Sequence, residues 1–256
     1  MEVSSFELIY KPQSPIGAAD RVLQGYFLNI TNLEDVDLRF SLSFVTSSVS
    51  DPDRSLFNNT VAFVDTANSN NTSASLSGGL TSSVFTLNPT ITIAPNETAK
   101  VALLPSDPFP VAVLPANFEA RGYVRLRLPA NIRFSFPGGV TFEPQLDRPA
   151  RVLLTPQNRA TYLDASGVIN DQTQSSLPTA SGGALAEITP ETGFVFRPPL
   201  IAESLREIPN LDSLDLSERD IATMLAVLPA SGVDFKDINA ALKEAGIGMA
   251  LESRKT

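Results

Sequence analysis

Hydrophobic and polar residues alternate most regularly over residues 36–44, and this alternation predicts a β-strand. The apolar positions are Val36, Leu38, Phe40, Leu42 and Phe44, and the residues between them are Asp37, Arg39, Ser41 and Ser43. Because successive side chains of a strand point to opposite faces, one face of this segment meets a core and the other meets water. Similar but shorter stretches predict further strands at residues 6–10, 22–31, 60–65, 84–87, 90–93, 99–104, 123–128, 132–136, 150–155, 184–188 and 193–196.

Turn-forming residues lie between these predicted strands. Examples are "NLED" at residues 32–35, "PN" at 95–96 and "PGG" at 137–139, and all of these residue types favour tight turns. About a dozen short strands with polar turns are typical of a mainly β protein with two packed sheets. We therefore expect an antiparallel β-sandwich, either immunoglobulin-like or jelly-roll-like.

Part of the chain resembles a known family. Residues 26–44, "YFLNITNLEDVDLRFSLSF", read as a strand, a short acidic turn and an alternating strand, and residues 91–105, "ITIAPNETAKVALLP", as a strand, a proline-containing turn and a strand. Over residues 20–105 the chain resembles bacterial immunoglobulin-like β-sandwich domains, with Asn96 where glycine is more usual. The resemblance implies a sandwich fold and implies no particular function.

Two polar segments are predicted to be loops. Residues 156–183 are rich in polar residues, glycine and proline, and we expect either a long loop that lies over the sandwich or a segment that becomes ordered only against a neighbour. Residues 65–79, "DTANSNNTSASLSGG", contain almost no apolar side chains, which predicts a hairpin or loop tip. Both segments thus belong to one predicted domain, residues 1–199.

The hydrophobic period changes after Pro199. Ile221, Met224, Leu225 and Leu228 recur at the spacing of one helix face. A second helix is predicted from Asp234, with Phe235 on its apolar face, up to Gly246. Residues 200–256 are therefore expected to form a small appendage of short helices. Its apolar stripes need a surface to pack on, either the sandwich or another copy of the chain.

The composition excludes several classes of chemistry. The 256 residues include no Cys, no His and no Trp, so thiolate and imidazole metal sites, a cysteine nucleophile and a Ser-His-Asp triad are impossible. The net charge of −9 argues against nucleic acid as a partner. No apolar run approaches the roughly 20 residues of a membrane helix. We expect no cofactor, no metal site, no catalytic residues and no membrane insertion.

Arginine is concentrated in one part of this acidic chain. Residues 121–159 hold seven of the 14 arginines against two carboxylates, Glu143 and Asp147, a local net charge of +5. They pair either with acids of the same molecule or with those of a neighbouring copy, since Arg is enriched at interfaces. Binding of an anionic polymer is a third and less favoured alternative. The segment from Glu203 onward, with ten acids and six bases, is one candidate counterpart. The candidate interface residues are Arg121, Arg125, Arg127, Arg133, Ile221, Leu225, Leu228 and Phe235.

Five asparagines lie in the N-x-[ST] pattern of glycosylation acceptors: Asn29, Asn58, Asn70, Asn71 and Asn96. Glycosylation would require export from the cell. The alternative interpretation is that Asn, Ser and Thr are simply turn residues.

Three hypotheses about function follow. The first is a non-catalytic structural protein that assembles with copies of itself in a surface layer, filament or particle. The second is an extracellular binding module, adhesin-like or recognising a carbohydrate or another protein, although the lack of Trp removes the usual sugar-binding platform. The third is a hydrolase that uses only carboxylates. We favour the first, and with it a location at the cell surface or in an assembled particle, although residues 1–13, "MEVSSFELIYKPQ", lack the features of a signal peptide.

Overall fold

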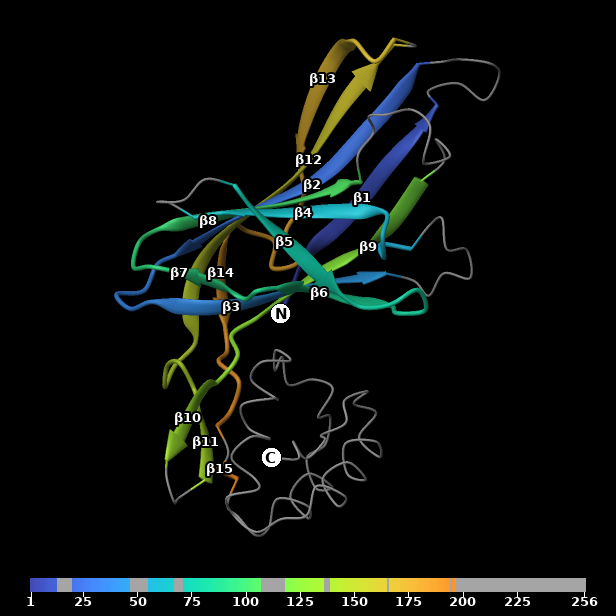
Figure 1. The fold of residues 1–256 in the computed structure, drawn as a ribbon. Coiled ribbons are helices and arrows are strands. Elements are labelled where there is room, and N and C mark those ends of the chain that lie inside the picture. Colours follow the sequence, from blue (N-terminus) through green and yellow to red (C-terminus); the bar gives the residue numbers. More distant parts are fainter. Residues whose placement is uncertain are drawn as a thin grey trace, which may run out of the picture. The chain divides into compact units, whose positions relative to one another are not determined.

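The computed structural model describes residues 1–12, 20–46, 55–66, 71–106, 118–135, 139–164, 166–193 and 195–196. These residues form β-strands and contain no helix (Figure 1). The strands are β1 (Glu2–Pro12), β2 (Arg21–Asn32), β3 (Leu38–Thr46), β4 (Thr60–Asp65), β5 (Thr72–Ser77), β6 (Val84–Asn88), β7 (Ile91–Ile93), β8 (Thr98–Pro105), β9 (Phe118–Arg127), β10 (Asn131–Ser135), β11 (Gly139–Glu143), β12 (Ala150–Leu163), β13 (Ile169–Ser176), β14 (Leu185–Ile188) and β15 (Val195–Phe196).

Eight strands close into an antiparallel barrel. Their order is β1-β9-β3-β6-β5-β4-β8-β2, and β2 pairs back with β1 through Ile9 opposite Gln24 and Tyr10 opposite Leu23. The predicted sandwich, immunoglobulin-like or jelly-roll-like, is therefore wrong. Strand β1 pairs with β9 on one side and with β2 on the other, so the two ends of the sheet are hydrogen-bonded to each other. Closure of a sheet on itself removes exposed edges, which a sandwich retains.

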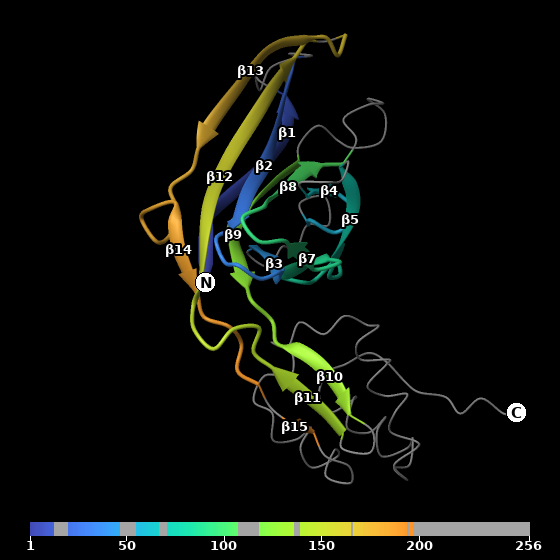
Figure 2. The ribbon, with the colours of Figure 1, turned by 90° about the vertical axis from the view of Figure 1, so that its left-hand side faces the viewer.

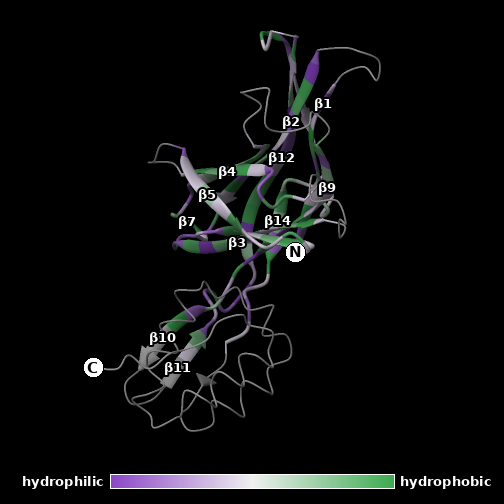
Figure 3. Ribbon diagram, turned by 45° about the vertical axis from the view of Figure 1, so that its right-hand side comes forward, coloured by the Kyte–Doolittle hydropathy of each residue, from purple (hydrophilic) through white to green (hydrophobic). Residues whose placement is uncertain are grey.

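Alternation predicted most of these strands correctly. Along β3, Figure 3 shows hydrophobic and hydrophilic residues alternating in green and purple, and the predicted strand at residues 60–65 is β4. Residues 65–79, predicted as a hairpin or loop tip, contain β5, which pairs antiparallel with β4 as in a hairpin and with β6 on its other side. Serine and threonine fill the outward positions of β5, while Ala74 and Leu76 are half-buried, so its apolar pattern is weak.

Side chains fill the interior of the barrel. The rings of Phe6, Tyr26 and Phe44 meet edge to face, with centroids 5.5 to 6.2 Å apart, a favourable geometry for aromatic pairs. The Tyr26 hydroxyl shares a hydrogen bond of 2.9 Å with the Ser4 hydroxyl. Burial raises the pKa of Tyr26 above its usual value. The barrel is thus closed around a packed core.

A long hairpin extends from the barrel where a loop was predicted. Strand β12 pairs with β2 from Val152 opposite Asn32 to Leu163 opposite Arg21, and on its other side it pairs with β13 and β14. Figure 2 shows β13 and β12 side by side. The predicted loop at 156–183 is therefore wrong over the end of β12 and all of β13. The eight residues of β13 are all exposed, so this strand has no buried apolar face that alternation could reveal.

Residues Met1–Leu128 and Arg148–Thr189 form one compact unit. The second unit contains Pro129–Asp147 together with the segment that begins at Pro190. In the second unit, β10, β11 and β15 form a three-stranded sheet. The sequence had predicted a single domain over residues 1–199. The predicted helical appendage, residues 200–256, lies outside the described residues. No helix long and apolar enough to span a membrane occurs among the residues that the structure describes.

Candidate functional site

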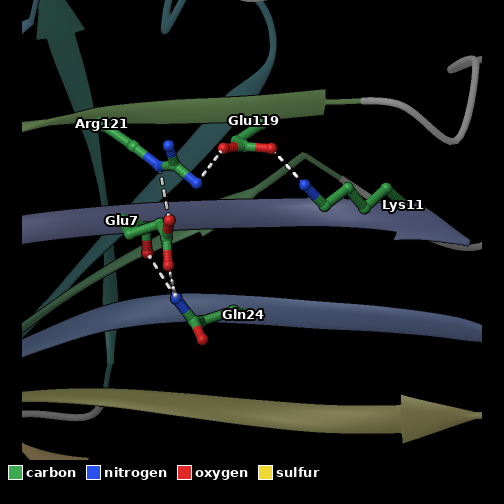
Figure 4. A network of polar contacts seen from close by, with 5 residues as sticks. All are labelled: Glu7, Lys11, Gln24, Glu119 and Arg121. Atoms are coloured by element: carbon green, nitrogen blue, oxygen red, sulfur yellow. Dashed lines mark hydrogen bonds and ion pairs between the residues drawn. The ribbon is translucent and has the colours of Figure 1, made fainter. Parts of the chain in front are cut away.

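The first candidate interface arginine, Arg121, lies in a network of ion pairs within the chain (Figure 4). Its Nε donates to Glu7 Oε1 at 2.6 Å and its Nη2 contacts Glu119, which also binds Lys11. The Gln24 side chain adds hydrogen bonds to Glu7. The Glu7 hydrogen bond, together with the charges of Glu119 and Glu7, raises the pKa of Arg121. Strands β1 and β9 thus supply the carboxylates that pair with this arginine, and β2 supplies the amide that bonds to Glu7.

The other candidate arginines differ in their surroundings. Arg125 Nε lies 3.5 Å from Glu2, and its guanidinium stacks 5.7 Å from the Tyr123 ring centroid. Arg127 is half-buried on the same strand. Arg133 lies on β10, in the second unit. Arg121, Arg125 and Arg127 thus lie at alternate positions on one face of β9, and Arg121 and Arg125 have carboxylate partners in their own chain.

We expect the substitution Arg121→Gln to have little effect. Exposed ion pairs contribute little to stability and are screened by salt, and this guanidinium is exposed. The melting temperature of the variant should be slightly lower than that of wild type at low salt, and this difference should vanish at high salt. Thermal melting and light scattering at both salt concentrations would measure this. A change in the mass of the particle in solution would instead make Arg121 an interface residue.

The remaining predicted positions divide into two groups. Ile221, Leu225, Leu228, Phe235 and Asn70 lie outside the described residues. Of the other sequon asparagines, Asn29 is half-buried on β2, whereas Asn58, Asn71 and Asn96 are exposed. Asn58 and Asn96 adopt left-handed backbone angles, with φ of 63° and 59°. Asparagine tolerates this conformation better than most residues, so both have a structural reason to be asparagine.

A buried carboxylate that sequence reasoning treated as part of a turn is Glu34. Its side chain is 1% exposed. It contacts the Arg148 guanidinium, accepts the Arg151 backbone N–H at 2.8 Å, and lies 3.5 Å from Arg151 Nε. The Arg148 hydrogen bond, followed by the Arg151 N–H, lowers the pKa of Glu34 to about 2. The Glu34 N–H in turn donates to Asn32 Oδ1 at 3.0 Å. This cluster fastens β12 to the turn between β2 and β3.

The second feature that the sequence did not reveal is the outer edge of β13. Leu177 N–H donates to Pro156 of β12 at 2.9 Å. Because successive N–H groups of an antiparallel strand point in opposite directions, Ser175 also faces β12, while Gln174 and Ser176 direct their N–H and C=O groups away from it. Among the described residues, β13 pairs only with β12. Its outward backbone groups therefore form an open sheet edge.

The loop that leads into β13 is held by a single carboxylate. Asp164 Oδ1 accepts the backbone N–H groups of Ser166 and Val168 at 2.8 and 2.9 Å and the Ser166 hydroxyl at 2.6 Å. These hydrogen bonds, with that of the Ser166 hydroxyl foremost, lower the pKa of Asp164. Gly167, with φ of 83°, completes the turn. These hydrogen bonds tie Asp164, which follows β12, to Ser166 and Val168, which precede β13.

Within the described ranges, no group of three or more Asp and Glu side chains is placed to hold a metal ion.

Comparison with known proteins gave no match to a family model, to a curated protein or to a solved structure. The function therefore has to be inferred from the residues of this chain.

Proposed function

We propose that the protein is a non-catalytic structural subunit that assembles with copies of itself. The observation that carries the proposal is the open edge of β13. Natural proteins protect edge strands with lysine, proline, bulges or a covering segment. The eight residues of β13, "INDQTQSS", contain neither lysine nor proline, and its one charged residue is Asp171. An edge of this kind is suited to pairing with another strand.

A second copy of β13 fits this edge. When two β13 strands run antiparallel with Gln174 opposite its own counterpart, the outward-facing Gln172 of each lies opposite Ser176 of the other. Asp171 then faces Leu177 of the other copy, so the two carboxylates do not meet. Such a contact is two-fold symmetric and closes on itself. It would join the two β12–β13 hairpins into one continuous sheet.

Two further features bear on this contact. The Gln172 N–H is already bound by its neighbour Asp171, at 2.8 Å from Oδ1, so this carboxylate restrains pairing at one end of the edge. Beyond the other end, Leu153 on β12 and Leu185 on β14 lie opposite each other and are both exposed. Exposed apolar cross-strand pairs of this kind are common where another surface packs.

Proline substitution at Ser176 tests the proposal. Ser176→Pro removes an N–H that faces away from β12, so the hairpin keeps its ladder of hydrogen bonds. Each contact between copies loses two hydrogen bonds, one from each copy. We expect wild type to have twice the 27.4 kDa monomer mass by light scattering at low and high salt, because main-chain hydrogen bonds are not screened as ion pairs are. The variant should dissociate at least about tenfold more readily, with an unchanged melting temperature.

The adjacent residue provides the matched control. Ser175 is also exposed, but its N–H donates toward β12, so Ser175→Pro should lower the melting temperature, unlike Ser176→Pro. Asp171→Ala frees the Gln172 N–H and should strengthen association. A wild-type protein that stays at 27.4 kDa across the accessible concentration range, or a Ser176→Pro variant that associates like wild type, would contradict the proposal.

A further inference from the structure

A groove lies over β2, β12 and β13, and its volume is about 540 Å³, within the range of sites for small organic ligands. Leu23 and Phe27 of β2 and Leu104 of β8 supply its apolar lining. Arg159 of β12 and the side-chain amides of Gln172 and Gln174 on β13 supply its polar groups. The groove therefore offers one cation and several hydrogen-bonding groups beside an apolar wall.

The cation in this groove has no carboxylate partner in the described part of the chain. The Arg159 guanidinium stacks on Phe27, 4.5 Å from the ring centroid, and its Nη2 donates to Gln157 Oε1 at 3.1 Å. Its Nε is buried and has no hydrogen-bond partner. A second cation, Lys100 Nζ, lies 5.8 Å from the same ring. Positive charge thus gathers around Phe27.

Another arginine on the same strand shows the contrast. Arg151 and Arg159 are eight positions apart on β12, so both side chains are on the same face of the sheet. Arg151 lies against the carboxylate of Glu34. Within the described residues, Arg159 contacts a neutral amide and an aromatic ring instead. Since a stacked guanidinium is held in place before a ligand arrives, it can bind a carboxylate at a low cost in side-chain entropy.

Gly25 contributes to the space in the groove. A Cβ atom at this position would overlap Leu104 Cδ2 and would lie 3.4 Å from the Phe27 ring. The missing side chain lets Leu104 and Phe27 lie over the backbone of β2 as an apolar wall. A ligand body can contact this wall while its charged end reaches Arg159.

We propose that this groove binds a small organic carboxylate that has an apolar body. The carboxylate accepts hydrogen bonds from the Arg159 guanidinium, which has the planar geometry suited to two parallel bonds. The apolar body covers Leu23 and Leu104, and the amide of Gln174 bonds the remaining polar atoms of the ligand. A compact inorganic anion would leave that apolar wall exposed to water, so the groove should prefer the organic anion.

Calorimetric titration of the full chain with octanoate, octanamide and inorganic phosphate tests this inference. We expect saturable binding of octanoate, at least about tenfold weaker binding of the uncharged octanamide, and no binding of phosphate. Arg159→Gln should lose at least about tenfold in octanoate affinity, whereas Arg151→Gln should bind like wild type. Arg159→Lys, which keeps the charge without the planar fork, should also bind more weakly, and melting curves would show that each variant is folded.

Several results would overturn the inference. These are a failure of octanoate to bind, equal affinities for octanoate and octanamide, preferential binding of phosphate, and an unchanged affinity in Arg159→Gln. Repeating the titration with Ser176→Pro separates this inference from the proposed assembly, because Ser176 does not line the groove. Octanoate binding should be the same in that variant, whether or not the wild-type chain associates.

Discussion

The substitution Gly122→Ala is expected to destabilise the barrel by about 3 kcal/mol, through strain of the kind produced by overpacking. Gly122 lies on β9 between Phe6 of β1 and Thr46 of β3. A Cβ atom at this position would overlap the carbonyl oxygen of Val45, lie 2.9 Å from the Val45 carbonyl carbon and lie 3.0 Å from Phe6 Cε1. The obstruction is mainly backbone, which cannot rotate aside as a side-chain tip can. The strands would have to separate where β9 joins β1 to β3.

Chemical denaturation followed by far-UV circular dichroism would measure this effect. Gly183→Ala is the matched control, because a Cβ atom there has no heavy atom within 4 Å. Alanine at such a position leaves stability unchanged or raises it slightly, since it restricts the unfolded chain. An equal stability of the two variants would mean that β3 and β9 do not approach as closely at Gly122 as the structure has them.

The contrast between β3 and β13 explains which parts of the fold the sequence could predict. Strand β3 alternates strongly between large apolar and polar side chains, so its position was predicted closely. Its second face was expected to meet water, but Ser41 and Ser43 on that face are buried. In β13 all eight side chains are exposed, so no hydrophobic period marks it. Composition then favours a loop, although the strand is held by its ladder with β12 and by the Asp164 turn. Backbone hydrogen bonding of this kind leaves little trace in the sequence.

Barrel closure depends on pairing between strands that are not adjacent in sequence. The contact of Phe6 with Gly122 and that of Ile9 with Gln24 decide whether the sheet closes. The alternation of each strand is the same in a sandwich and in a barrel, so it does not decide between them. Gly122 was a usable signal, since glycine inside a strand often marks a close approach of another backbone.

The contacts of the arginine cluster also depend on residues that are distant in the sequence, so they could not be predicted from it. The cluster's seven members were visible in the sequence, but their partners were not. Arg121, Arg125, Arg148 and Arg151 meet carboxylates of their own chain. In the described part of the chain, Arg159 contacts Phe27 and Gln157 instead, and the pairing of β12 with β2 is what brings Phe27 beside it. Counting charges therefore located the arginine-rich region, but it could not tell which arginine lacks a carboxylate partner among the described residues.

The substitution Glu34→Gln is expected to destabilise the barrel by about 2 kcal/mol at pH 7, a typical loss for hydrogen bonds to a buried charged group. Glutamine still has an oxygen for the Arg151 N–H, but it loses the charge that holds Arg148. Asp35→Asn, in the same turn and exposed, should have almost no effect and serves as the control. Denaturation with urea at pH 7 would compare the three proteins.

The same pair of proteins should show a defined pH dependence. Because the pKa of Glu34 falls from the ordinary 4.5 to about 2 in the folded protein, its carboxylate stabilises the fold fully above about pH 4.5, and this contribution is lost as the pH falls toward 2. Glutamine resembles the protonated acid at all pH values. The stability difference between wild type and Glu34→Gln should thus be constant from pH 7 to 5 and shrink steadily below pH 4.5. A difference that stays constant down to pH 2.5 would mean that Glu34 does not lie against Arg148 and Arg151, and that β12 is fastened to the β2–β3 turn in some other way.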